Sequence, residues 1–321
     1  MKKVRWGILG SGWIVGASFV PALHRLGREA ADAVIASRTP ERAAQKAAEW
    51  ELAGWAAPYD ALIARDDIDV VYIALPNHLH EEWAVRALEA GKHVLVEKPL
   101  GLTVASEERM MAAADRSHRY LWEAYAFLFR EQTRELVRRI QAGDIGAVTS
   151  IQSRFYADIG EDNIRWQPAL GGGALYDLGV YPLRLAALWF SDPVRVSGTF
   201  RPHRGVDAET MADVWHPGAH RLQFAVGFTL PFQTGAVLYG TEGRFVVTNP
   251  YHPAPHDRVF VERRGEWEPV AVGDDGPTFF PMLSHITRAV AGEIPAGHRA
   301  GPGSLAVIRT VEQLRAAMTP I

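Results

Sequence analysis

The segment 4–12, VRWGILGSG, limits what this chain can fold into more than any other feature. A short apolar run ends directly in Gly10-Ser11-Gly12, and an apolar-periodic segment follows from about Ile14 to Leu26. A strand, a glycine turn and a helix in this order are typical of a dinucleotide-binding unit. Gly10 permits the tight turn, and Gly12 lets the backbone approach a pyrophosphate at the positive N-terminal end of the helix. The residues predicted to contact the dinucleotide here are Gly10, Ser11, Gly12, Trp13 and Ile14.

One position departs from the usual G-x-G-x-x-G/A pattern. The third glycine or alanine is replaced by Val15, and Gly16 lies one place later. Because this position normally lets the helix pack closely on the strand, we expect slightly looser packing here.

Apolar runs then alternate with helical patterns: 33–37, 41–51, 69–75, 80–91, 93–97 and 106–117. Such alternation predicts a doubly wound parallel sheet of the Rossmann type over residues 1–122. The ligand of such a sheet lies beyond the carboxyl ends of its strands. The residues predicted at those ends are Ser37, Arg38, Leu75, Asn77, His80, Glu97 and Lys98.

Arg38 follows the second predicted strand, about 25 residues after the glycine turn. An NAD-binding domain normally presents a carboxylate there to the ribose diol, whereas a guanidinium can bind a 2′-phosphate bidentately. NADP is therefore favoured over NAD. The alternative is a solvated arginine that ends the strand and leaves the preference mixed.

Composition narrows the classes of protein. A chain of 321 residues with 48% hydrophobic and 22% charged residues is ordinary for a globular protein of two domains. A net charge of −3 gives no electrostatic footprint for nucleic acid, and the absence of cysteine excludes thiolate metal sites, disulfides and cysteine nucleophiles. Glycines interrupt the apolar N-terminal run, so we interpret it as mature, cytoplasmic sequence. No apolar stretch is long enough to span a membrane.

A second glycine-rich segment, LGGGALYDLGVYPL, covers residues 170–183. Asp177 and Tyr181 stand four residues apart, which on a helix places both on one face. The alternative is an aspartate that caps a turn and a tyrosine that packs in a core. Pro182 limits the geometry, because proline inside a helix removes a hydrogen bond and clashes with the preceding turn. The shared face survives if Pro182 lies in the first turn or if the helix kinks there.

The segment 74–100, ALPNHLHEEWAVRALEAGKHVLVEKPL, resembles the Gfo/Idh/MocA family of nicotinamide-dependent sugar and polyol oxidoreductases. The P-N-x-x-H and E-K-P motifs, the glycine turn and the segment 170–183 extend the resemblance over essentially the whole chain. The family's usual D-x-G-x-H motif ends here in Tyr181. The sequence of this segment is most similar to the branch of the family that contains dimeric dihydrodiol dehydrogenase, D-xylose dehydrogenase and glucose-fructose oxidoreductase.

The resemblance implies roles for particular residues. Lys98 would be the catalytic lysine, Tyr181 the proton-transfer residue and Asp177 a substrate-orienting group. Glu97 would lie near the nicotinamide ribose, and Asn77 and His80 would line the cofactor cleft. The family also implies a second domain with an open antiparallel sheet, through which subunits pair as a homodimer or higher homo-oligomer.

The second half of the sequence fits an α+β domain over residues 123–321. Short β-rich segments are predicted at 148–157, 194–201, 220–230, 233–240, 244–248, 258–264 and 267–272, and helices at 279–292 and 303–317. Strands joined by short turns indicate a mostly antiparallel sheet. An exposed sheet face of that size is normally covered, so a partner subunit is expected.

The remaining polar residues divide into pocket candidates and loop residues. Tyr156, Arg165 and Trp166 are candidates for contacting substrate, with packing or surface roles as the alternative. His216 and His220, and also His252 and His256, have the i, i+4 spacing of a helical metal site. Prolines between the members of each pair make helices there unfavourable, so we predict no metal site.

Two classes of function remain. The first is an NADP-dependent dehydrogenase that acts on a hydroxyl or carbonyl group of a sugar, polyol or cyclic diol. The second is a catalytically silent sensor that keeps the dinucleotide fold. Because a sensor needs neither Lys98 nor Tyr181, their joint presence favours the enzyme.

Overall fold

A computed structural model describes residues 3–321 of the chain, which form two compact units. Unit 1 comprises residues up to 101 together with 105–129 and 275–301, and unit 2 comprises 102–104, 130–274 and 302–321. The predicted boundary after residue 122 is thus corrected to one after Phe129. The sequence also did not indicate the return to unit 1, because a change in strand and helix rhythm cannot show where a later helix packs.

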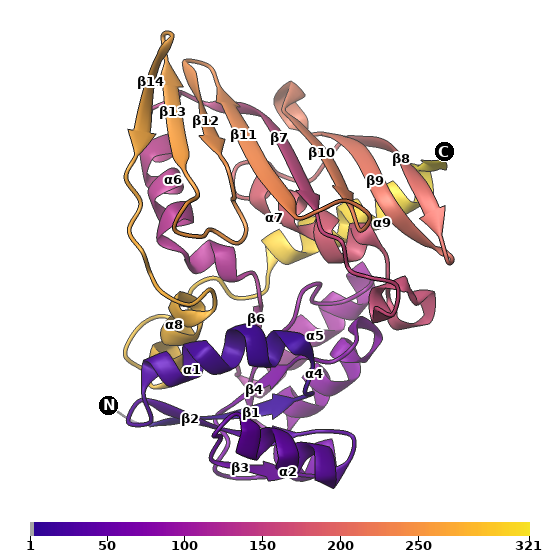
Figure 1. The fold of residues 1–321 in the computed structure, drawn as a ribbon, viewed down its shortest axis with the longest axis vertical. Coiled ribbons are helices and arrows are strands. Elements are labelled where there is room, and N and C mark those ends of the chain that lie inside the picture. Colours follow the sequence, from indigo (N-terminus) through magenta and orange to yellow (C-terminus); the bar gives the residue numbers. More distant parts are fainter. Residues whose placement is uncertain (1–2) are drawn as a thin grey trace. The chain divides into compact units, whose positions relative to one another are not determined.

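Unit 1 contains a parallel sheet with the order β3-β2-β1-β4-β5-β6 in the described part of the chain (Figure 1). Its strands are β1 (Val4–Leu9), β2 (Ala31–Ala36), β3 (Gly54–Ala56), β4 (Val70–Ile73), β5 (His93–Val96) and β6 (Leu121–Glu123). This order confirms the doubly wound Rossmann sheet. The strand order reverses between β1 and β4, which is where such sheets bind their ligand.

Helices cover both faces of this sheet. They are α1 (Val20–Leu26), α2 (Pro40–Glu49), α3 (Tyr59–Ile63), α4 (His80–Glu89), α5 (Val104–Ser117) and α8 (Phe280–Val290). Successive strand residues point to opposite faces. Leu9 and Val71 therefore join the core shared with α3, α4 and α5, whereas Trp6 and Tyr72 face the other way. The Trp6 indole donates a hydrogen bond of 3.3 Å to Thr287 in α8, which fixes that returning helix in unit 1.

Unit 2 contains a mixed sheet, ordered β14-β13-β12-β11-β7-β10-β9-β8-β15 among residues 3–321. Its strands are β7 (Val148–Tyr156), β8 (Arg195–His203), β9 (Val206–Trp215), β10 (Arg221–Gly227), β11 (Gln233–Gly240), β12 (Gly243–Val247), β13 (Val259–Arg263), β14 (Glu266–Val270) and β15 (Thr319–Pro320). Most neighbours are antiparallel, and the β10–β7 and β15–β8 pairs are parallel. The predicted open, mostly antiparallel sheet is confirmed.

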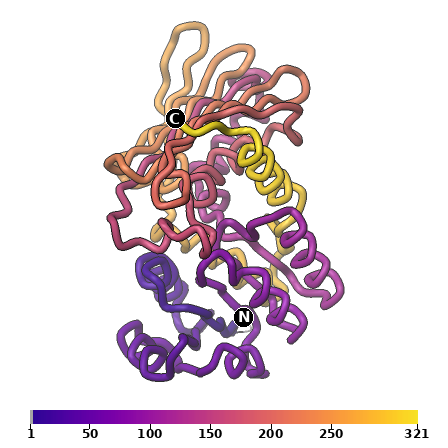
Figure 2. The backbone as a smooth tube through the Cα atoms, turned by 90° about the vertical axis from the view of Figure 1, so that its right-hand side faces the viewer, coloured from indigo at the N-terminus to yellow at the C-terminus, as the bar shows by residue number. Residues whose placement is uncertain are grey.

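The helices of unit 2 lie on one face of this sheet, as Figures 1 and 2 show. They are α6 (Glu131–Gln141), α7 (Val180–Ala186) and α9 (Pro302–Ala317). Along β7, Ile151 and Phe155 are buried beneath these helices, whereas Gln152 and Arg154 point to the opposite, exposed face. We call the helix-covered side the inner face and the exposed side the outer face.

Among the helices of residues 3–321, none combines the length and the apolar character that crossing a bilayer requires.

Candidate active site

The glycine turn of unit 1 is shaped by close contact between two strand ends. Gly10 has a φ of +102°, and a Cβ there would lie 2.5 Å from the carbonyl oxygen of Ala74, which follows β4. A side chain at this position would therefore be strained and would clash with backbone. A Cβ on Gly12 would meet no neighbouring atom of the described residues closer than 4.0 Å, the distance to the carbonyl oxygen of Ala74. Its space is open, as an approach of phosphate to the backbone requires.

The helix after the turn begins irregularly. Residues Val15–Phe19 form a π-helical turn before α1. Val15 is fully buried, and the Phe19 ring stacks on Tyr72 with centroids 4.6 Å apart. The looser helix packing expected from Val15 is therefore not found. A π turn takes up one extra residue, and Gly16, one place late in the pattern, gives room to the ring of Trp50.

Serine and arginine side chains gather beside the glycine turn. Ser37 is buried at the end of β2, and its Oγ lies 3.3 Å from Ser11 Oγ. Arg42 Nε donates to Ser11 Oγ at 2.6 Å. Arg38 is exposed, and it forms no ion pair with a carboxylate among the residues that the structure describes. Burial raises the pKa of Tyr59, and the positive charges of Arg38 and Arg42 both oppose that rise, so both guanidinium groups lie near Tyr59.

The sequence did not lead us to predict that Arg42 lies at the cofactor site. It stands in the first turn of α2, whose N-cap Thr39 accepts a hydrogen bond from the Arg42 backbone N–H. A helix N-terminus favours anions, and two arginines beside it strengthen that preference. The signal that could have found Arg42 is the Thr39-Pro40 helix start, which places a residue three positions later on the first turn.

His80 is fully buried at the start of α4. Its Nδ1 lies 2.8 Å from the Pro99 carbonyl oxygen and its Nε2 lies 2.9 Å from the Leu75 carbonyl oxygen. Burial lowers the pKa of His80, and the hydrogen bonds to the two backbone carbonyls oppose that lowering. The ring joins the segments that carry Leu75 and Lys98. The predicted contact between His80 and the cofactor stays a prediction.

The other predicted residues of unit 1 lie at the carboxyl edge of the sheet. Glu97 follows β5, and Tyr72 donates to its Oε1 at 2.6 Å. Lys98 comes next and is half-buried, and the Lys98–Pro99 peptide bond is cis. The remaining members of this edge are Leu75, which is buried, Asn77 and Ile14, which are half-buried, and Trp13, which is 80% exposed.

The three glycines of unit 2 serve close contacts within that unit. Gly171 and Gly173 have φ values of +79° and +118°, which glycine adopts readily. A Cβ on Gly172 would overlap the carbonyl oxygen of Arg165, and one on Gly173 would overlap the carboxylate of Asp207. Backbone conformation and close packing within unit 2 therefore explain why glycine occupies these positions, without reference to a cofactor.

Asp177 and Tyr181 lie on one continuous helical stretch. A π-helical turn, Leu175–Gly179, leads directly into α7, which begins at Val180. Pro182 is the third residue of α7 and lies inside this continuous stretch, three residues beyond the π-helical turn. The condition that the proline lie in the first turn is therefore not met. The stretch stays helical through Pro182 next to a π turn, which is a common site of helix bending. Asp177 is 13% exposed at its side chain, and Tyr181 is 7% exposed.

Asp177 forms an ion pair with Arg165. The Arg165 Nε donates to Asp177 Oδ2 at 2.7 Å, and Arg165 Nη1 donates to Asn163 Oδ1 at 3.3 Å. Arg165 lies on a 3₁₀ turn, Ile164–Trp166, that Asn163 caps. Two of the predicted residues are thus brought together. The Arg165 side chain is 40% exposed.

An aromatic cluster holds the Tyr181 ring. Its centroid lies 5.2 Å from Phe155, 5.2 Å from Tyr251 and 5.4 Å from His252. Tyr251 is fully buried, and burial raises the pKa of its phenol far above its ordinary value. Tyr251 and Ser153 share a hydrogen bond of 2.7 Å. Tyr251 is therefore a neutral packing residue. No pattern in the sequence indicates that the proline-containing loop brings His252 beside Tyr181.

Two substrate candidates lie elsewhere. Tyr156 points to the outer face, where it neighbours Gly227 and Glu209, whereas Tyr181 packs on the inner face against Phe155. Adjacent strand residues point to opposite faces, so Tyr156 and Phe155 lie on different sides of the sheet. The substrate contact predicted for Tyr156 stays a prediction. Trp166 is 6% exposed, and its Nε1 donates to the Gly160 carbonyl at 2.7 Å. Its ring also packs edge-on against His203 and Phe228, with centroids 4.9 Å and 5.2 Å away, so Trp166 is a packing residue.

The histidine pairs behave as loop residues. His216 and His220 flank a short turn, Pro217–Ala219, and His252 and His256 lie in the loop before β13. No cluster of three or more metal-ligating side chains occurs within residues 3–321.

Comparison with known proteins supports the fold and identifies the family. Residues 4–125 match the model described as "Oxidoreductase family, NAD-binding Rossmann fold", and residues 133–246 match the "GFO/IDH/MocA C-terminal domain". A dTDP-3,4-didehydro-2,6-dideoxy-alpha-D-glucose 3-reductase from Streptomyces violaceoruber is 36% identical over 95% of this chain and 88% of its own length. A D-xylose 1-dehydrogenase (NADP(+)) from Haloferax volcanii is 33% identical over 96% of this chain and 95% of its own.

A solved structure extends the likeness to three dimensions. The 3-ketoreductase from Actinomadura kijaniata, in complex with NADP and TDP-benzene, has a TM-score of 0.88 and 30% identity. The alignment covers 100% of this chain and 99% of the other. These relatives are dehydrogenases and reductases. They support an enzymatic function for this chain and give no support to the prediction of a silent sensor. The chain therefore belongs to the Gfo/Idh/MocA family and is an NAD(P)-dependent oxidoreductase.

Proposed function

We propose that the protein is an NADP-dependent oxidoreductase that interconverts a hydroxyl and a carbonyl group on a sugar or a closely related polyol or diol. Tyr181 carries this proposal, because the aromatic cluster holds its ring on the same helical stretch as Asp177, whose carboxylate pairs with Arg165. A phenol can exchange a proton with a substrate oxygen, and the ion pair offers both an acceptor and a donor to neighbouring hydroxyls. A dissociable cofactor is regenerated by other enzymes, which supports a cytoplasmic location.

The residues of unit 1 fit an NADP molecule. Gly10 and Gly12 leave the backbone open for a pyrophosphate, and Arg38 and Arg42 stand at the N-terminal end of α2, where a 2′-phosphate would be attracted. When bound, the nicotinamide supplies or accepts the hydride. The protein's own part is to hold the cofactor, orient the substrate oxygen and move its proton.

We propose that Tyr181 takes the substrate hydroxyl proton during oxidation and returns it during reduction. Lys98 would stabilise the phenolate by its positive charge, and Asp177 would accept a hydrogen bond from a neighbouring substrate hydroxyl. Solved structures of the Actinomadura 3-ketoreductase include a variant with tyrosine changed to phenylalanine and one with lysine changed to alanine. These are the two residue types proposed here.

The substrate can be identified by a spectrophotometric screen. Formation or loss of NADPH would be followed with D-xylose, D-glucose, a trans-dihydrodiol and a dTDP-linked keto sugar, each repeated with the NAD form. The relatives named above support sugars, either free or nucleotide-linked. Turnover with a sugar and NADP is expected. Absence of turnover with every compound, in a sample that still binds NADPH, would favour the silent sensor.

Arg38→Ala is expected to raise the KM for NADP+ by roughly one to two powers of ten, the loss of a charge-assisted contact of about 1.5–3 kcal/mol. The KM for NAD+ should stay almost unchanged, because NAD+ has no 2′-phosphate. Steady-state kinetics with both cofactors measure this difference. Arg42→Ala should act in the same direction, since its guanidinium lies beside Ser11.

Arg28→Ala serves as a matched control for both variants, because Arg28 follows α1 and pairs with Glu51 on the exposed surface. An equal loss with NADP+ and NAD+ would instead show that the arginines support the fold.

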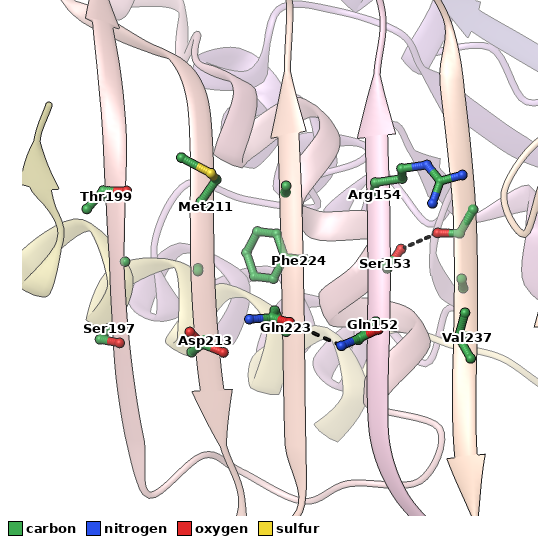
Figure 3. Close-up of a pocket in the computed structure, with 15 residues that line it drawn as sticks. Gln152, Ser153, Arg154, Ser197, Thr199, Met211, Asp213, Gln223, Phe224 and Val237 are labelled. Carbon is green, nitrogen blue, oxygen red and sulfur yellow. Dashed lines mark hydrogen bonds between the residues drawn. The ribbon is translucent and has the colours of Figure 1, made fainter. Parts of the chain in front are cut away.

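The outer face of the unit 2 sheet supports pairing of two copies. A hollow of about 690 Å³ lies on this sheet. Figure 3 shows the side chains that line it, among them Gln152, Arg154 and Met211. Gln152 and Gln223 are hydrogen-bonded at 3.3 Å, and the Arg154 guanidinium lies over Gly235. Met211 is 46% exposed. A two-fold axis could bring one such face against its copy, because isologous pairing places the same patch on both subunits.

Light scattering is expected to give a mass of about twice the 35.4 kDa of one chain, or a higher multiple. Ala225→Arg, which places a bulky charge in the middle of the outer face, should shift the mass to that of one chain. Glu242→Arg, in the exposed turn between β11 and β12, is the control and should leave the mass unchanged. A single-chain mass for the unaltered protein at micromolar concentration would contradict the proposal.

A further inference from the structure

Asp207 is a buried carboxylate that none of the preceding steps uses. It lies at the start of β9 and is 5% exposed. Its Oδ2 accepts a hydrogen bond of 2.6 Å from the Leu175 backbone N–H and one of 2.8 Å from the Thr210 hydroxyl, which is itself fully buried. A side chain of the sheet thus holds the first residue of the π-helical turn that leads to Asp177 and Tyr181.

The helical stretch has no cap of its own at this end. Ala174 occupies the N-cap position, and no side chain near it in sequence accepts the first N–H groups. The first N–H groups of a helix need acceptors, and a carboxylate is also favoured there by the helix dipole. Asp207 supplies that acceptor from a strand 32 residues later in the chain.

Gly173 lets the carboxylate come close. A Cβ on Gly173 would overlap Asp207 Oδ1, and the residue has a φ of +118°. The Asp177 backbone N–H then donates to the Gly173 carbonyl at 3.1 Å, which begins the helical winding. The point at which the winding starts is therefore set by the contact between Gly173 and Asp207.

The environment of the carboxylate shows how firmly it is held. Burial raises the pKa of Asp207, and the Leu175 and Thr210 hydrogen bonds oppose that rise. Its second oxygen, Oδ1, is buried without a hydrogen-bond partner among the described residues. Burying a partly unsatisfied carboxylate is costly, whereas an apolar residue could fill the same volume. The Leu175 backbone N–H needs a hydrogen-bond acceptor, and this need accounts for the carboxylate at position 207.

We infer that Asp207 is a positioning residue, which fixes the start and the rotation of the helical stretch so that Tyr181 and Asp177 face the substrate. This inference rests on the proposed function of Tyr181. The stretch has two anchors: Asp207 holds its start, and the Phe155–Tyr251 pair holds the Tyr181 ring. Without the first anchor, the opening turn loses its acceptor and the phenol shifts. A displacement of about 1 Å costs roughly a hundredfold in rate.

Asp207→Ala is expected to lower kcat roughly ten- to a hundredfold, while NADPH affinity, which belongs to unit 1, stays within about twofold. Asp207→Asn keeps an oxygen that can accept from Leu175 and Thr210, so it should restore kcat to within roughly fivefold of the unaltered enzyme. Val214→Ala is the control for stability. Val214 is a fully buried residue of the same strand, away from Leu175. It should lower the melting temperature without changing kcat more than about twofold.

The double variant Asp207→Ala with Tyr181→Phe separates positioning from general destabilisation. If Asp207 acts through Tyr181, its loss should cost much less once the phenol hydroxyl is gone, and the remaining loss is its effect through Asp177. Full multiplication of the two losses would overturn the inference. So would an Asp207→Ala enzyme that keeps its kcat, or a Val214→Ala enzyme that loses as much.

Amide hydrogen exchange over residues 174–181 tests the position without any turnover. Faster exchange in Asp207→Ala, but not in Asp207→Asn or Val214→Ala, is expected. If Tyr181→Phe keeps full activity while Asp207→Ala still releases this segment, the proposed role of Tyr181 fails and the anchoring by Asp207 stands. Unchanged exchange in Asp207→Ala would overturn the anchoring itself.

Discussion

Tyr181→Phe is expected to lower kcat by roughly two to four powers of ten, which is the usual contribution of general acid–base catalysis. The substitution keeps the ring and its packing against Phe155 and Tyr251 and removes the hydroxyl alone. NADPH affinity should change by no more than a few-fold, because the cofactor residues lie in unit 1. Single-turnover measurement of hydride transfer gives the relevant rate, since product release can otherwise limit kcat.

The expected size follows from the chemistry. Hydride leaves a carbinol carbon only as the hydroxyl proton is removed, so a base must stand within about 3 Å of that oxygen. An unperturbed phenol has a pKa near 10, about three units above neutral pH, which corresponds to roughly 4 kcal/mol. Tyrosine therefore needs electrostatic help to serve as a base at pH 7, and removing its hydroxyl removes the whole route.

Tyr251→Phe is the matched control. Tyr251 touches the same ring cluster, but its hydroxyl bonds to Ser153 and is fully buried. Losing that hydrogen bond should cost about 1 kcal/mol of unfolding free energy and leave the rate of hydride transfer within a few-fold. If Tyr181→Phe behaved like Tyr251→Phe, Tyr181 would be a packing residue.

Much of unit 1 was predictable because its signals are local. The run into Gly10-Ser11-Gly12, the alternation of apolar runs with helical patterns, and the polar residues after β4 and β5 each lie within a few positions of one another. These signals predicted the parallel sheet and the carboxyl edge at which Leu75, Asn77 and Glu97 lie. The short elements β3 and α3 were missed, since three to five residues carry too little periodicity to register.

Unit 2 was harder, because its elements depend on distant partners. β9 was missed, because Asp207, Ala208 and Glu209 are poor strand formers by propensity. Pairing with β8 along its whole length, and with β10 from Glu209 to Trp215, overrides that propensity. The helix α6 was also missed, although buried Leu136 and Ile140 have helical spacing. No local pattern showed that residues 275–301 return to unit 1.

The site shows the same division. Asp177, Tyr181 and Arg165 could be named from one stretch of sequence, and the Asp177–Arg165 ion pair confirms that two of them meet. Asp207 and His252 could not be named, because β9 and the loop before β13 reach the helical stretch through the fold. Which face Tyr156 occupies depends on a register of one residue, and only the pairing of β7 with its neighbours fixes that register.

Lys98→Met is expected to lower kcat at pH 7 by a similar two to three powers of ten, and the loss should diminish as the pH rises. A lysine ammonium about 4 Å from a phenolate, at an effective dielectric near 20, contributes about 4 kcal/mol. That matches the help which tyrosine needs at neutral pH. Without this charge the phenol returns toward its ordinary pKa near 10. A base that is protonated at pH 7 then becomes active when the solution is made alkaline.

The pH profile of the oxidation reaction therefore distinguishes electrostatic help from a merely structural role. In the unaltered enzyme, kcat should level off near neutral pH, whereas in Lys98→Met it should climb tenfold per unit toward pH 10. Lys3→Met is the control. Lys3 pairs with Asp32 at the amino end of the sheet, opposite the edge that carries Glu97 and Lys98, so its loss should leave the profile unchanged. A Lys98→Met enzyme whose loss is the same at every pH would show that the lysine holds the cofactor or the substrate and does not tune the phenol.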